Sequence, residues 1–126
     1  MSDITYSPQY PSSTELTINF SDADAFVPEK DGYGFVETVT LEEGDAKHLR
    51  DTLNCYVENE KAGLPCKTSH DLDGSASRVV LTREADLAVF TFFSLDGRRK
   101  KPITVIKRPA KDIAHMIRFS LKGWRP

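Results

Sequence analysis

The stretch Leu87-Ala-Val-Phe-Thr-Phe-Phe-Ser-Leu95 predicts a β-strand, because aromatic and β-branched residues dominate it. Successive side chains of a strand point to opposite faces of the sheet. One face therefore carries Leu87, Val89, Thr91, Phe93 and Leu95, and the other carries Ala88, Phe90, Phe92 and Ser94. Both faces are apolar, so both must be covered. Helices can cover one of them, and the other needs the N-terminal segment, a second subunit or a ligand.

The segments on either side of this strand predict further strands and two helices. Alternating patterns predict strands over Glu15–Phe20, Tyr33–Leu41, Arg78–Arg83 and Ile103–Lys107, with a hairpin turn at Asp96-Gly97. The region 67–77 is expected to be a polar connection. Apolar residues at helical spacing predict helices over Asp45–Lys61 and from Pro109 to about Lys122. Their core stripes are Ala46, Leu49, Leu53, Tyr56 and Val57, and Ala110, Ile113, Ala114, Ile117 and Leu121.

These elements predict an α+β fold: a mainly antiparallel sheet of about five strands with two helices on one face, in the order β-β-α-β-β-β-α. Residues 1–13 are polar and contain two prolines, so we expect a flexible arm followed by a single domain over residues 14–126. Residues 14–63 and 77–126 also resemble each other weakly, which is consistent with an internal duplication. The alternative is that any strand–helix unit repeats such a pattern.

Composition indicates an ordinary globular protein, with 39% hydrophobic and 29% charged residues. We find no apolar stretch of membrane-spanning length and no basic-then-apolar start typical of a secretory signal, and therefore expect a cytoplasmic protein without membrane contact. The two cysteines, Cys55 and Cys66, do not make a disulfide framework, and we expect both thiols to be reduced bystanders.

Charge is segregated along the chain. Residues 1–63 contain 13 acidic and 4 basic side chains, whereas residues 64–126 contain 6 acidic and 13 basic ones. From Arg98 onward, ten Lys or Arg residues accompany the single acidic residue Asp112. The formal net charge of −2 hides this division. Such an uneven electrostatic field affects binding partners and association rather than the fold.

The basic C-terminal surface is the strongest functional candidate. Cations that neutralise phosphates, beside an aromatic ring on which a base can stack, favour nucleic-acid binding, DNA included. A solvated basic surface without a ligand is the alternative. The candidate residues are Arg98, Arg99, Lys100, Lys101, Lys107, Arg108, Lys111, His115, Arg118, Phe119 and Lys122. On the last helix we expect Ile113 and Ile117 to be buried and Phe119 to be at least partly exposed.

The acidic half supports a second hypothesis: a protein–protein adaptor or inhibitor that binds a basic protein. Its acidic residues crowd the expected turns and strand ends: Asp22, Asp24, Glu29, Asp31, Glu37, Glu42, Glu43 and Asp45. Ordinary solubility is the competing explanation.

An enzyme is the least favoured class. A small hydrolase would need Cys66 and His70 to lie together with a group that orients them, which spacing alone does not establish. Ser69 to Val80 resembles a calcium loop but has Val80 where a bidentate Glu is required. Cys66 and His70 supply only two metal ligands, and His48 and His115 fall on outer helix faces. We therefore expect a non-catalytic binding module with no cofactor and no metal.

Self-association is the last expectation. Helices on one face of the sheet leave Phe90 and Phe92 on the other, and soluble monomers rarely expose such a patch. Oppositely charged halves would also attract one another between copies. A homodimer that buries Phe90, Phe92 or their strand neighbours is therefore predicted.

Overall fold

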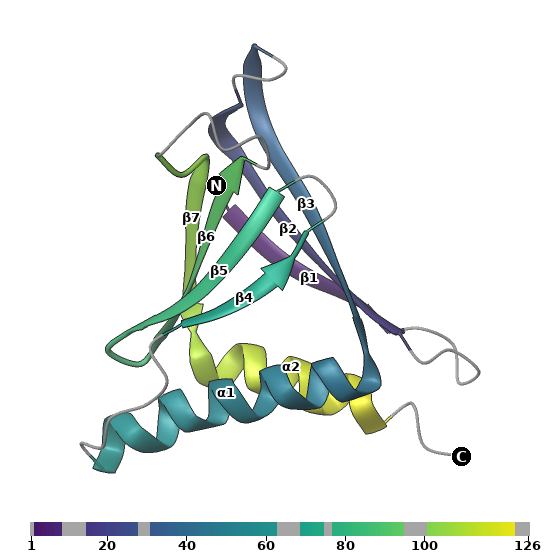
Figure 1. Cartoon of the computed structure of the whole chain (residues 1–126), viewed down its shortest axis with the longest axis vertical. Helices are drawn as coiled ribbons and strands as arrows, with labels where there is room; N and C mark the ends of the chain where they lie inside the picture. Colours follow the sequence, from purple (N-terminus) through teal and green to yellow (C-terminus); the bar gives the residue numbers. More distant parts are fainter. Residues whose placement is uncertain are drawn as a thin grey trace.

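The computed structural model describes residues 2–8, 15–27, 31–62, 69–74, 77–94 and 101–122. Seven strands and two helices lie in these ranges, in the order β-β-β-α-β-β-β-β-α (Figure 1). The elements are β1 (Ser2–Pro8), β2 (Glu15–Val27), β3 (Gly32–Glu42), α1 (Glu43–Ala62), β4 (Ser69–Asp73), β5 (Ser77–Glu84), β6 (Leu87–Ser94), β7 (Thr104–Pro109) and α2 (Ala110–Lys122). The predicted α+β class is confirmed.

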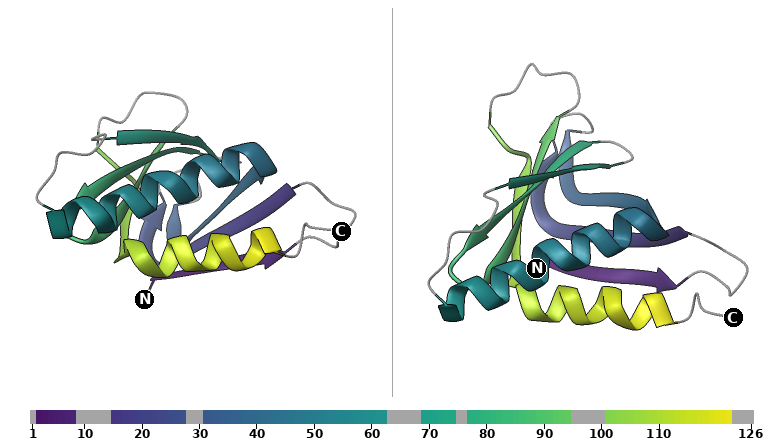
Figure 2. Two further views of the ribbon diagram at one scale, coloured as in Figure 1. Left: turned by 90° about the horizontal axis from the view of Figure 1, so that it is seen from below. Right: turned by 60° about the horizontal axis from the view of Figure 1, so that its bottom comes forward.

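The strands form two antiparallel sheets rather than the single sheet expected from the sequence. One sheet has the order β1-β2-β3 and the other the order β4-β5-β6-β7. An isolated bridge between Val39 and Gly74 connects β3 to the end of β4. The helices α1 and α2 lie side by side, run in opposite directions and cover one end of both sheets (Figures 1 and 2). Each helix directly follows the last strand of one sheet.

The core lies between the two sheets and the helix pair. Phe20 of β2 packs on Phe90 and Phe92 of β6, with ring centroids 5.0 and 5.2 Å apart. Phe35 of β3 lies 4.9 Å from Phe92. Phe90 and Phe92 are consequently buried within one chain, at 1% and 0% exposure. The predicted homodimer was to bury Phe90, Phe92 or their strand neighbours. The expectation that these two rings need a second copy is wrong, because the first sheet already covers them.

On the other face of β6, Val89 is buried at 7% exposure. Leu87, Thr91 and Phe93 are half-buried there. The guanidinium of Arg78, from the neighbouring β5, lies over the Phe93 ring at 5.1 Å from its centroid. A long side chain within the same sheet therefore supplies part of the cover that the sequence required.

Two strands were missed. Residues 2–8 were expected to belong to a flexible arm, but they form β1, which pairs with β2 from Ser2–Asp22 to Pro8–Leu16. Ile4 and Tyr6 pack against the core and hold β1 in place. Residues 69–73 were expected to lie in a polar connection, but they form β4, in which Leu72 is buried. In both strands polar residues outnumber the one or two apolar anchors, so the alternation is weak.

Both predicted helices are confirmed, and most of each predicted stripe is buried; Val57 is half-buried, and the side chain of Leu121 lies outside the described residues. Ala46, Leu49, Leu53 and Tyr56 of α1 are all 0% exposed. In α2, Ala110, Ile113, Ala114 and Ile117 are buried. Cys55 of α1 is disulfide-bonded, so the expectation that it is a reduced bystander is wrong. The other cysteine of the chain, Cys66, and the turn at Asp96-Gly97 lie outside the described residues.

Candidate nucleic-acid interface

Helix α2 has a basic and aromatic outer face. A helix repeats every 3.6 residues, so positions 111, 115, 118 and 119 share one side, opposite the buried stripe. Lys111, His115, Arg118 and Phe119 are all exposed. The Phe119 side chain is 62% exposed, whereas Ile117, two positions earlier, is fully buried. Both expectations for this helix, buried isoleucines and an exposed Phe119, are confirmed.

The cations of this face have no partner within the part of the chain that the structure describes. The ion pairs there join Lys47 to Glu43, Arg50 to Asp51 and Lys107 to Glu84, and none involves α2. The only acidic residue of α2 is Asp112, exposed beside Lys111. Lys111, His115 and Arg118 are therefore available to an external anion.

Arg108, also predicted to bind nucleic acid, makes a structural contact. Its guanidinium donates to the Ser2 carbonyl oxygen at 2.6 Å and to the Ser2 hydroxyl at 3.1 Å, and it also donates to the Lys107 carbonyl oxygen at 2.7 Å. This side chain is half-buried and ties the end of β7 to the start of β1. Lys107 remains exposed, paired with Glu84 at 2.8 Å.

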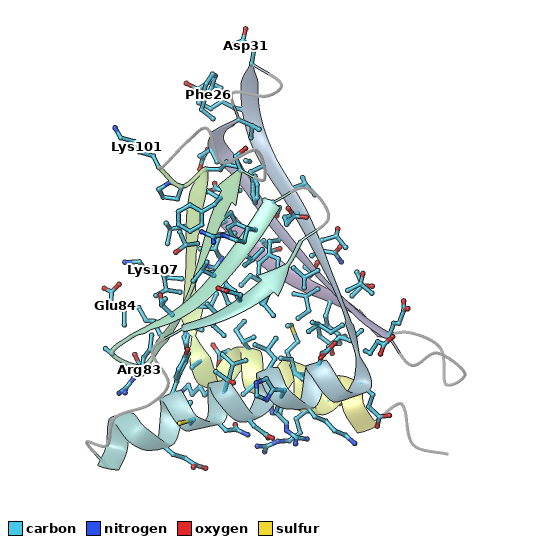
Figure 3. The ribbon with its side chains drawn as sticks, viewed as in Figure 1. Phe26, Asp31, Arg83, Glu84, Lys101 and Lys107 are labelled. Carbon is cyan, nitrogen blue, oxygen red and sulfur yellow. The ribbon has the colours of Figure 1, made fainter. Side chains whose placement is uncertain are left out.

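The described members of the predicted basic set do not form one continuous cluster. Lys101 is exposed and precedes β7, whereas α2 follows that strand, so the two lie at opposite ends of β7 (Figure 3). Lys107 lies between them. Arg98, Arg99 and Lys100 fall outside the described residues, as does the side chain of Lys122. Among the described members of the set, those that lie together are the α2 residues Lys111, His115, Arg118 and Phe119.

Glu37 was expected at the acidic surface, but it is buried between the two sheets at 1% exposure. Its Oε1 accepts a hydrogen bond from the Thr38 amide at 2.9 Å, and its Oε2 accepts one from the Ser77 hydroxyl. Glu37 therefore connects β3 to β5, a role that the sequence analysis missed. The signal was present: on a strand, Glu37 shares the inward face of Phe35 and Val39.

Asp22 is another acidic residue with an internal role. Its Oδ2 accepts a hydrogen bond from the Thr104 hydroxyl at 2.6 Å. This bond links β2 of one sheet to β7 of the other. The acidic surface thus loses two of its predicted members to contacts between the sheets. Asp24, Asp31, Glu42 and Asp45 are exposed, as the hypothesis of an acidic surface requires.

Among the residues whose placement is described, no three His, Cys, Asp or Glu side chains gather as metal ligands would. His48 and His115 are exposed on their helices. Cys66 and the side chain of His70, the pair considered for a hydrolase, lie outside the described set. None of the described helices is long and apolar enough to span a membrane.

Fold and site together define an α+β module with a basic and aromatic helix face. Comparison of the chain with protein-family models, with curated proteins and with solved structures finds no match.

Proposed function

We propose that the chain is a non-catalytic module that binds nucleic acid through the outer face of α2. The observation that supports this proposal is Phe119, 62% exposed on the same face as Lys111, His115 and Arg118. Phenylalanine is more often buried than exposed, and here the exposed ring lies beside cationic side chains on one helix face. Lysine and arginine neutralise phosphates, and an exposed ring offers a base a surface on which to stack.

The size of the face limits the affinity. Lys111 and Arg118 are seven residues apart, so they lie about 10 Å apart along the helix axis. That length is about three times the axial rise of one nucleic-acid strand per phosphate. Two or three phosphate contacts give a shallow salt dependence, with a slope of about −2 to −3 in log K against log salt. Stacking on Phe119, at about 1–3 kcal/mol per base, must then supply much of the affinity.

Fluorescence anisotropy with labelled single- and double-stranded oligonucleotides tests this proposal across a salt series. Lys111→Ser and Arg118→Ser should each weaken binding and reduce the magnitude of the salt slope by about 1. Lys47→Ser is the matched control, because Lys47 is an exposed lysine on the neighbouring helix α1 and is already paired with Glu43. Absence of binding to DNA and RNA at low salt would overturn the proposal.

A quadruple variant, with Arg98, Arg99, Lys100 and Lys101 replaced by Ser, tests the rest of the predicted basic set. If the ligand extends along β7, this variant should also weaken binding and flatten the salt slope. If only α2 binds, the quadruple variant should behave like the Lys47→Ser control.

A homodimer and a cytoplasmic location stay predictions. The disulfide at Cys55 does not favour a reducing compartment.

A further inference from the structure

The β2–β3 hairpin ends in an exposed aromatic pair. Its end projects beyond the other strands, where Phe26 and Asp31 are labelled at the top of Figure 3. Phe26 and Tyr33 are register partners, and their rings meet edge to face with centroids 5.5 Å apart. The side chains are 44% and 72% exposed, respectively. We call Asp24, Phe26, Asp31 and Tyr33 the hairpin tip.

The fold does not need the aromatic pair. Ala25 and Val27, the chain neighbours of Phe26, pack against the core and anchor this end of β2, whereas Phe26 and Tyr33 do not belong to that cluster. Two large rings held together in solvent contribute little to a hydrophobic core. Since exposed aromatic residues are enriched where proteins bind partners, the tip has the character of a contact site.

Charge at the tip indicates the kind of partner. The segment from Asp22 to Glu37 contains five acidic residues and one basic residue, Lys30. Asp22 and Glu37 accept hydrogen bonds between the sheets, and the residues Asp24 and Asp31 are exposed. Asp31 has a positive φ of 49°, so it lies at the turn itself. Exposed acidic residues and exposed rings at the same end of a hairpin repel phosphate and attract cations.

We propose that the hairpin tip docks an arginine-containing basic segment of a partner protein, with a guanidinium over the Phe26–Tyr33 pair and its charge facing Asp24 and Asp31. Arginine is favoured over lysine, because its planar, weakly hydrated guanidinium stacks on rings and pairs with carboxylates at once. The chain itself contains such a contact, in which Arg78 lies over Phe93 at 5.1 Å. This surface is separate from α2 and takes a ligand of the opposite charge.

The test uses the full chain and two fluorescent peptides, nona-arginine and nona-lysine, titrated by anisotropy at low salt. We expect the arginine peptide to bind at least threefold more tightly than the lysine peptide. The double variant Phe26→Ser/Tyr33→Ser should weaken arginine-peptide binding at least fivefold and abolish the preference for arginine. Asp24→Asn/Asp31→Asn should weaken both peptides, and Asn tolerates the positive φ at position 31.

Phe119→Ser is the matched control, because it removes an exposed ring from α2 rather than from the tip. It should leave peptide binding unchanged and weaken oligonucleotide binding, while the tip variants should do the reverse, so the two proposals fail independently. Unfolding curves show that each variant is folded. Equal binding of both peptides, or unchanged binding by the Phe26/Tyr33 variant, overturns the proposal. Self-association that disappears only in the tip variants also overturns it, since the occupant is then a second copy.

Discussion

Tyr56 is 0% exposed, and its buried hydroxyl has no hydrogen-bond partner among the described residues. A buried polar group without a partner costs about 1–3 kcal/mol. Tyr56→Phe keeps the ring and removes the oxygen, so we expect an unchanged or higher free energy of unfolding, by up to about 2 kcal/mol. Urea unfolding at neutral pH measures it. A clear loss of stability would show that the hydroxyl has a partner in solution.

Tyr56 should also make the stability of the fold depend on pH in the alkaline range. Burial raises the pKa of Tyr56 above its usual 10.0, and the nearby Arg83 guanidinium offsets this only in part. Above pH 10.0 the unfolded chain therefore loses this proton while the folded chain keeps it. Stability is fully present below that pH and falls as the pH rises toward the folded pKa. Tyr56→Phe should show a smaller alkaline loss of stability than the wild type, and equal losses would contradict this.

A further prediction at the residue scale concerns the effect of a side chain at Gly74 on stability. A Cβ atom at this position would lie 2.7 Å from Cδ of Glu37 and 2.7 Å from the Ser77 carbonyl oxygen. Gly74→Ala must therefore push the seam between the sheets apart, and we expect a loss of about 1–3 kcal/mol.

Gly44 is the control, because a Cβ there has nothing within 4 Å and the residue lies in α1. Gly44→Ala should stabilise by up to about 1 kcal/mol. Thermal unfolding of the two variants should shift in opposite directions. Equal shifts would mean that the contact of Gly74 with Glu37 is not close.

At the scale of an element, α2 combines a core face with a binding face. Ile117 is fully buried, and Ile117→Ala should cost about 2–4 kcal/mol of unfolding free energy, as expected for a large-to-small change in a core. Phe119→Ala should cost well under 1 kcal/mol, as exposed positions usually do, and weaken oligonucleotide binding instead. Chemical denaturation and anisotropy of both variants separate the two faces. Comparable destabilisation by both would refute this division.

At the scale of the whole molecule, Phe90 and Phe92 do not support a dimer, because Phe20 and Phe35 cover both rings within one chain. What remains is attraction between the acidic first half and the basic second half of different copies. Because salt screens such attraction, any self-association should weaken as salt rises. Light scattering on a sizing column at low and high salt measures it. A dimer of equal stability at both would point to an apolar interface instead.

The periodic spacing of apolar residues predicted most of the helices and strands. Both helices and the strands β2, β3, β5, β6 and β7 appear where apolar spacing indicated them, though β2 is much longer than expected. Apolar spacing shows which side of each element must be buried, whichever surface covers it. The face of α2 was also predictable, since helical spacing alone separates Ile117 from Phe119.

The sequence by itself determined the class of the fold, the two amphipathic helices, the need to cover both faces of β6 and the division of charge. Only the tertiary structure decided that two sheets face one another, that β1 and β4 are strands, and that Glu37 and Arg108 join distant segments. Local patterns report which side of an element is apolar. They do not report which surface meets it, because that choice depends on packing between residues far apart in the chain.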